Sequence, residues 1–104
     1  MNMETAPNQE ITCLHAVIDG QVQGVGFRYF AMELAETVGV TGWVRNRFDG
    51  TVEVMAEGRR LILESFLDQL RRGPRGAYIT NVAVDWQPAD NKFIQFEIRR
   101  TSYN

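Results

Sequence analysis

A glycine-rich segment at residues 20–28 limits what this chain can fold into more than any other stretch. It reads Gly-Gln-Val-Gln-Gly-Val-Gly-Phe-Arg and lies between an apolar run at residues 11–19 and a segment with helical periodicity. Glycine allows the positive φ values that a tight turn between a strand and a helix requires. Such a turn points successive N–H groups toward one spot, and the following helix adds the positive end of its dipole. The segment is therefore typical of an anion-binding loop.

Arg28 ends this segment and supplies a planar guanidinium suited to a phosphate or a carboxylate. The loop and Arg28 together predict a site for a phosphate-like group. A tight connection followed by a solvated arginine is the alternative that the loop alone leaves open. The segment is not a P-loop, because no Gly-Lys-Ser/Thr sequence ends it, and Tyr29 stands where a dinucleotide-binding fingerprint requires glycine.

Two helices are predicted from apolar residues that recur at spacings of three and four. The first spans about three turns and ends at Gly39, which suits the left-handed conformation of a helix C-cap. The second ends at Gly73 and Pro74. The predicted buried stripes are Phe27, Phe30, Ala31, Leu34 and Val38 in the first helix, and Leu61, Ile62, Phe66, Leu67 and Leu70 in the second.

Five segments rich in β-forming residues are the predicted strands: residues 11–19, 40–45, 51–57, 79–86 and 93–101. Asp49-Gly50, between the second and third strands, is a hairpin signal because both residues tolerate positive φ. Apolar and polar residues alternate in the third strand, so one of its faces is expected to be buried. Gly58 is expected to turn the chain after it, and residues 87–92 are expected to form another turn.

The order β-α-β-β-α-β with one further terminal strand matches an α+β fold, the ferredoxin-like split β-α-β sandwich. Two helices are expected on one face of a mostly antiparallel sheet. In this topology the first two strands are parallel, with the third between them, so their C-terminal ends meet at one edge of the sheet. The loop at residues 20–28 is therefore expected to lie beside Asn46. An anion cradle beside a side-chain amide suits a hydrolase, since one binds a phosphoryl group and the other can hold a water.

The composition excludes several function classes. A net charge of -2 argues against a general nucleic-acid binder. One cysteine and one histidine are too few for a zinc site, and no apolar run reaches the length of a membrane span. Residues 1–10 are predicted to be a flexible tail and residues 11–104 a single domain, monomeric and cytoplasmic. We expect no metal, cofactor, nucleic acid or membrane as a partner.

The glycine-rich motif at residues 20–28 is followed by Gly-Trp-Val-Arg-Asn at residues 42–46 and Asp-Gly-Thr-Val-Glu at residues 49–53. These segments resemble the two signature motifs of the acylphosphatase family. The likeness extends from about Ile11 to Arg99, nearly the whole chain, and two long motifs at this spacing are specific. The chain departs from the family in its longer N-terminal tail and at residues 77–82, away from both motifs.

The resemblance implies a metal-independent hydrolase without a cofactor. It would cleave the carboxyl-phosphate anhydride of small acyl phosphates into carboxylate and phosphate, by in-line attack of water. Arg28 would bind the phosphoryl group, and Asn46 would orient the attacking water. Inorganic phosphate or sulfate would also bind as a ligand. The backbone amides that would form the phosphate-binding loop are those of Gln23, Gly24, Val25, Gly26 and Phe27.

Two other functions stay open at this point. One is a non-catalytic domain of the same fold that binds phosphate or acyl phosphate or has a regulatory role, because fold alone does not fix function. Similar domains also occur within larger hydrogenase-maturation enzymes. The other is an RNA-binding sheet, which the acidic, aromatic-free strand at residues 51–57 argues against.

Single residues near the motifs are interpreted as structural. Trp43 is expected in the core and Asp49 in a turn. His15 is expected to be exposed or hydrogen-bonded locally. Arg45 and Arg47 would flank the predicted site and could assist substrate capture, but we expect them to be mainly solvated.

Overall fold

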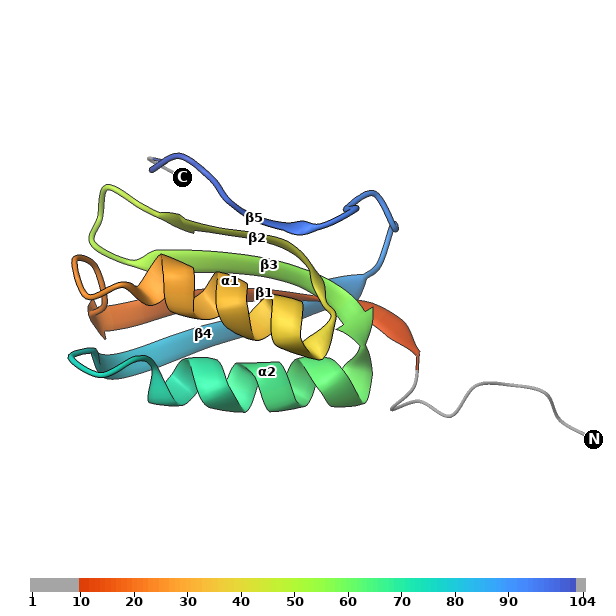
Figure 1. The fold of residues 1–104 in the computed structure, drawn as a ribbon, viewed down its shortest axis with the longest axis horizontal. Coiled ribbons are helices and arrows are strands. Elements are labelled where there is room, and N and C mark those ends of the chain that lie inside the picture. Colours follow the sequence, from red (N-terminus) through yellow and green to blue (C-terminus); the bar gives the residue numbers. More distant parts are fainter. Residues whose placement is uncertain (1–9, 103–104) are drawn as a thin grey trace, which may run out of the picture.

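Two helices cover one face of a five-stranded sheet (Figure 1). The structure is a computed structural model that describes residues 10–102. All but the last residue of the predicted tail lie outside this range, and the backbone carbonyl of that residue, Glu10, accepts a hydrogen bond from the N–H of Arg60. The elements are β1 (Ile11–Gln21), α1 (Phe27–Val38), β2 (Thr41–Asn46), β3 (Val52–Arg59), α2 (Arg60–Arg72), β4 (Tyr78–Pro88) and β5 (Phe96–Ile98).

The strand order is β4-β1-β3-β2-β5. β3 pairs antiparallel with both β1 and β2, so these two strands run parallel to each other on either side of it. β4 adds an antiparallel edge beside β1, and β5 adds a parallel edge beside β2. The predicted ferredoxin-like α+β sandwich, with two helices on one face of a mostly antiparallel sheet, is confirmed.

The core lies between the helices and the sheet. The helix-facing residues of β1 and β3 are fully buried, among them Leu14 and Val54. Leu61 and Ile62 of the second predicted stripe are exposed, which the sequence did not anticipate. At 3.6 residues per turn, Leu61 lies on the opposite side of α2 from the buried face, and Ile62 lies about a quarter turn away from that face. The buried residues of α2 are Leu63, Phe66, Leu67 and Leu70.

The central strand β3 is buried on both faces, although only one buried face was expected. Glu53 and Glu57 point away from the helices, yet they are only 7% and 5% exposed. Both glutamates are buried because β3 lies between β1 and β2, whose side chains cover its helix-free face. β3 also continues through Gly58, which pairs with Thr12 instead of turning the chain.

The two edge strands differ from their predicted lengths. β4 continues to Pro88, which pairs with Thr12, so part of the predicted turn is strand. Proline is tolerated in an edge strand because the outer side of that strand has no neighbouring strand that needs a backbone N–H donor. β5 is only three residues long, and Ile94, predicted to lie in this strand, is 93% exposed. The predicted strand at residues 93–101 was therefore too long.

Three connections gather at one end of the sheet, on the left in Figure 1: the β1–α1 loop, the β2–β3 turn and the α2–β4 connection. The predicted site residues lie in the β1–α1 loop, at the start of α1 and at the end of β2, next to the first two connections. Parallel β1 and β2 both end there, as the topology requires.

Candidate active site

The β1–α1 loop has the backbone conformation that its glycines were expected to allow. Gly24 and Gly26 have φ values of 75° and 78°, and Gly26 is the N-cap of α1. A Cβ atom at either position would meet no atom within 4 Å. Glycine is therefore favoured at these two positions because the backbone is left-handed, and not because a side chain would clash with its surroundings.

The amides of this loop are not used by the fold. Among residues 10–102, the N–H groups of residues 23–27 donate no hydrogen bond to a backbone carbonyl. The first such bond is from the N–H of Phe30 to the carbonyl of Gly26, at 3.0 Å. No side chain caps α1 either. The loop thus presents unpaired donors at a helix N-terminus, the arrangement that favours an anion.

Gln23 ties the loop to the β2–β3 turn. Its side-chain Nε2 donates hydrogen bonds to the carbonyl oxygens of Arg47, at 2.7 Å, and Thr51, at 2.9 Å. Gln23 was expected to contribute only its backbone amide, so this side-chain contact was not predicted. A long amide within a glycine loop was the available signal, but its acceptors lie 24 and 28 residues away.

Asn46 is the last residue of β2. Side chains alternate along a strand, so Asn46 points to the same side as the fully buried Val44, which faces the helices. Its backbone carbonyl accepts a hydrogen bond from Ser102 at 3.0 Å. Within the described part of the chain, its half-buried side-chain amide has no hydrogen-bond partner. The amide is therefore available to a ligand or a water.

Arg28 is the second residue of α1 and is half-buried. No carboxylate of residues 10–102 forms an ion pair with its guanidinium. A cation without an internal partner, one residue after a loop of free amides, is suited to bind an anion.

The β2–β3 turn that follows Asn46 is rigidified by Asp49, which is the turn residue that was expected. Its Oδ1 accepts hydrogen bonds from the hydroxyl of Thr51 at 2.6 Å and from the backbone N–H of Thr51 at 3.0 Å. These bonds, the one from the hydroxyl most of all, hold the pKa of Asp49 below its usual value. The turn thereby fixes the carbonyl oxygens that Gln23 contacts.

Arg45 does not flank the loop, and it is not mainly solvated as expected. Its side chain lies on the helix-free face of the sheet, where Nε donates to Glu53 Oε1 at 2.8 Å. His15 Nε2 lies 2.6 Å from the other oxygen of Glu53, so the histidine is satisfied locally, one of the two outcomes expected. Burial tends to raise the pKa of Glu53, but the bonds from His15 and Arg45 outweigh it and lower that pKa.

Arg47 differs from expectation, whereas Trp43 is buried as expected. The Arg47 side chain is only 22% exposed, and its closest acidic partner is Asp49 at 3.8 Å. Trp43 is buried, but on the helix-free face, below the guanidinium groups of Arg45 and Arg99. It therefore lies outside the core between helices and sheet.

The described residues offer no metal site and no membrane-spanning helix. Among residues 10–102, no three His, Cys, Asp or Glu side chains lie close enough together to hold a metal ion. Within the same range, neither helix is long and apolar enough to cross a membrane.

The comparisons with known proteins identify the family. The family model described as Acylphosphatase matches residues 14–98. The chain belongs to the acylphosphatase family. An acylphosphatase of Salinibacter ruber is 45% identical over 98 residues, which are 94% of this chain and 100% of the relative. The crystal structure of acylphosphatase from Bacillus subtilis superposes with a TM-score of 0.82 at 36% identity, covering 85% of this chain and 98% of that one.

Part of a larger protein is also similar. The structure of full-length HypF has a TM-score of 0.81 and 26% identity, and covers 90% of this chain but only 12% of its own. The chain thus spans the whole length of the Salinibacter acylphosphatase and a small part of HypF. The resemblance to the acylphosphatase family that the motifs predicted is confirmed.

Proposed function

We propose that this chain is an acylphosphatase that hydrolyses small acyl phosphates to a carboxylate and phosphate by in-line attack of water. The observation that supports this most directly is the set of amides of residues 23–27. Among residues 10–102 these amides have no backbone acceptor, the adjacent Arg28 has no carboxylate partner, and Gln23 joins the loop to the turn after Asn46. Membership of the acylphosphatase family supports the same reaction.

In this proposal the phosphate-binding loop and Arg28 hold the phosphoryl group. The amides of residues 23–27 donate to its oxygens, and the guanidinium of Arg28 adds a fixed positive charge. Phosphoryl transfer passes through a loose transition state with charge on the equatorial oxygens, so fixed donors around them provide most of the catalysis. Inorganic phosphate or sulfate is expected to bind the same donors.

Asn46 is proposed to orient the attacking water. Its amide faces the helix side of the sheet and lacks a partner among the described residues. The acyl phosphate has a good leaving group, so no strong general base is required. This agrees with a site formed by an arginine, an asparagine and backbone amides. A metal or cofactor has no step in this mechanism, and a monomeric, cytoplasmic enzyme remains part of the proposal.

The proposal is tested by following benzoyl phosphate hydrolysis in the presence of excess chelator. Arg28→Ala is expected to reduce kcat/KM by about a thousandfold, because it removes the fixed charge. Asn46→Ala is expected to reduce kcat by about a hundredfold through loss of water positioning, while the inhibition constant of inorganic phosphate is unchanged.

Arg71→Ala and Asn81→Ala are the matched controls, because both residues are exposed and lie outside the site. Both should retain wild-type rates. Absence of hydrolysis by the wild type, with phosphate still bound to the loop, would favour the non-catalytic binding domain. A loss of rate on chelation would contradict the metal-free mechanism.

A further inference from the structure

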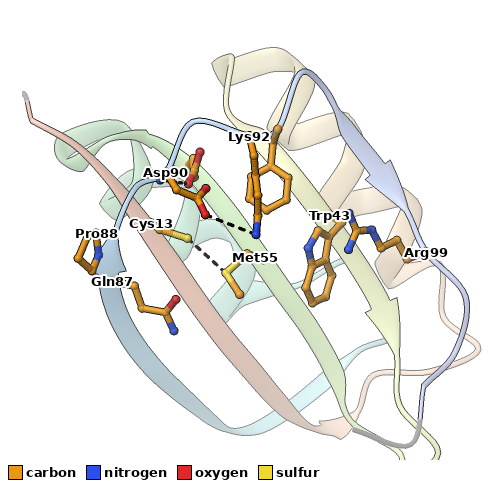
Figure 2. Close-up of a pocket in the computed structure, with 10 residues that line it drawn as sticks. Cys13, Trp43, Met55, Gln87, Pro88, Asp90, Lys92 and Arg99 are labelled. Carbon is orange, nitrogen blue, oxygen red and sulfur yellow. Dashed lines mark hydrogen bonds and ion pairs between the residues drawn. The ribbon is translucent and has the colours of Figure 1, made fainter.

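A pocket lies on the helix-free face of the sheet, away from the proposed catalytic loop (Figure 2). Its volume is about 320 Å³, within the range of small-molecule sites. Side chains from β1, β2, β3 and the end of β4 line it, together with the segment before β5 and Arg99 after it. None of its lining residues belongs to the loop at residues 20–28, and Asn46 does not line it either.

The floor of the pocket is apolar. Cys13 and Met55 lie side by side, with their sulfur atoms 3.2 Å apart, and the Trp43 ring lies next to Met55 (Figure 2). Phe93 adds a second aromatic side chain to the lining. An apolar body of a ligand would be buried here against sulfur and aromatic carbon, which are adaptable and favourable contacts.

Trp43 presents an unused donor to this pocket. The residue is only 6% exposed, and its indole N–H has no acceptor among residues 10–102. Figure 2 shows the indole nitrogen on the side of the ring that faces Lys92. Arg47 Nε is the one buried side-chain N or O atom without a partner in the described part of the chain, so the Trp43 N–H faces the pocket and its water, and a ligand oxygen that accepted this bond would replace a water.

Two cations stand near this donor, and their internal partners are weak. Lys92 Nζ lies 3.4 Å from Asp90, and Arg99 Nε lies 3.3 Å from Glu97. All four side chains are largely or half exposed, so these ion pairs contribute little and are easily exchanged. The guanidinium of Arg99 also lies 5.0 Å from the centre of the Trp43 ring. Each cation near Trp43 therefore has an exposed carboxylate partner that a ligand carboxylate can replace.

The acidic groups of the pocket lie on its other side. Glu57 is buried and its Oε2 accepts a hydrogen bond from the backbone N–H of Asp90 at 3.0 Å. Asp90 lies on the Cys13 side of the pocket, whereas Trp43 and Arg99 lie on the opposite side, with Lys92 Nζ between them (Figure 2). Asp90 nevertheless lies 3.4 Å from Lys92 Nζ, so a ligand carboxylate that binds Lys92 must take the place of Asp90.

We propose that this pocket is a second binding site, for a small organic carboxylate with an apolar body. The carboxylate accepts hydrogen bonds from the Trp43 indole N–H and Lys92 Nζ, within the field of Arg99, and the apolar body lies over Cys13 and Met55. A carboxylate matches the three donors better than a neutral amide, because bonds between charged groups are about twice as strong. This inference does not depend on the proposed catalytic function.

Phenylacetate is a suitable probe, with phenylacetamide and phenethylamine as its neutral and cationic counterparts. We expect phenylacetate to shift the indole N–H resonance of Trp43 in ¹H–¹⁵N spectra, with a Kd of about 1 mM. The indole resonance of Trp86, which lies on the helix side against Arg60, should not move. Phenylacetamide should bind at least about tenfold more weakly, and phenethylamine should not shift Trp43.

Two variants test the donors. Trp43→Phe keeps an aromatic ring but removes the N–H, and should weaken phenylacetate binding by about tenfold, with Trp86→Phe as the matched control. Lys92→Gln changes an exposed side chain and should weaken binding by about threefold with the fold intact. In Trp43→Phe, binding is followed through the methyl resonance of Met55.

Three results would overturn the proposal. One is phenylacetate shifting only the amides of residues 23–28, because the carboxylate would then bind the catalytic loop instead. Another is phenethylamine or phenylacetamide binding as tightly as phenylacetate, because the site would then not select a carboxylate. The third is unchanged affinity in both Trp43→Phe and Lys92→Gln.

Discussion

Replacing Gln23 with leucine tests whether the contact between the loop and the β2–β3 turn holds the site together. Leucine has a similar size but cannot donate to the carbonyl oxygens of Arg47 and Thr51. Each of these two bonds is expected to contribute about 0.5–1.5 kcal/mol to stability. The loss of both would therefore lower the free energy of unfolding by about 1–3 kcal/mol.

The lower half of this range is expected, because neither carbonyl would be left without a donor. The Arg47 carbonyl also accepts from the N–H of Gly50 at 3.1 Å, and the Thr51 carbonyl accepts from the N–H of Arg47 at 2.9 Å. A loss of about 1–2 kcal/mol corresponds to a decrease in Tm of about 5–10 °C for a domain of this size. Urea denaturation with an unchanged m-value would measure the difference directly.

Catalysis should be affected more than stability. Without the tether, the loop and Asn46 are no longer held at a fixed separation, and a misplacement of about 1 Å between reacting groups can cost about a hundredfold in rate. We therefore expect kcat for benzoyl phosphate to decrease by about 10- to 100-fold in Gln23→Leu at a temperature where the protein is folded. Gln95→Leu, at an exposed position, is the control. Wild-type kcat and stability in Gln23→Leu would refute the reasoning.

Three further predictions concern the sheet. Glu53→Gln removes the charge that binds His15 and Arg45 and should cost about 2 kcal/mol at pH 7 in urea denaturation. Folding lowers the pKa of Glu53, so the stability difference between wild type and Glu53→Gln should have its full size above the unfolded pKa of about 4.3. It should shrink as the pH falls below that value. A stability difference that persists at lower pH would contradict the assignment. Gly42→Ala would place a Cβ 1.9 Å from the carbonyl oxygen of Met55, at a φ of 140°. The substitution should lower the free energy of unfolding by more than about 3 kcal/mol, measured by thermal unfolding. A near-wild-type Tm would refute this prediction. Burial, with smaller contributions from nearby acidic side chains, raises the pKa of Cys13 to about 11. The folded protein should therefore react with a thiol reagent far more slowly at pH 8 than the unfolded protein. Equal rates would be inconsistent with the buried thiol.

Short-range signals in the sequence were sufficient for most of the fold. Apolar spacing predicted both helices and all five strands, and glycines marked the ends of the helices and the loop at residues 20–28. These features depend on backbone conformation and side-chain alternation within a few residues. The two motifs gave Arg28 and Asn46 as site residues, and the β-α-β-β-α-β order brought their segments to one end of the sheet. Their catalytic roles remain proposals.

Contacts between distant strands were decided only by the tertiary structure. The tether from Gln23 to Arg47 and Thr51, the burial of Glu53 between His15 and Arg45, and the pocket below Lys92 all join residues far apart in the chain. Each depends on which strands are neighbours and in what register, and a polar side chain in one strand carries no signal of its partner in another. The sequence by itself determined the local conformations and the family, whereas the packing of the strands determined which polar groups are buried, paired or left free for a ligand.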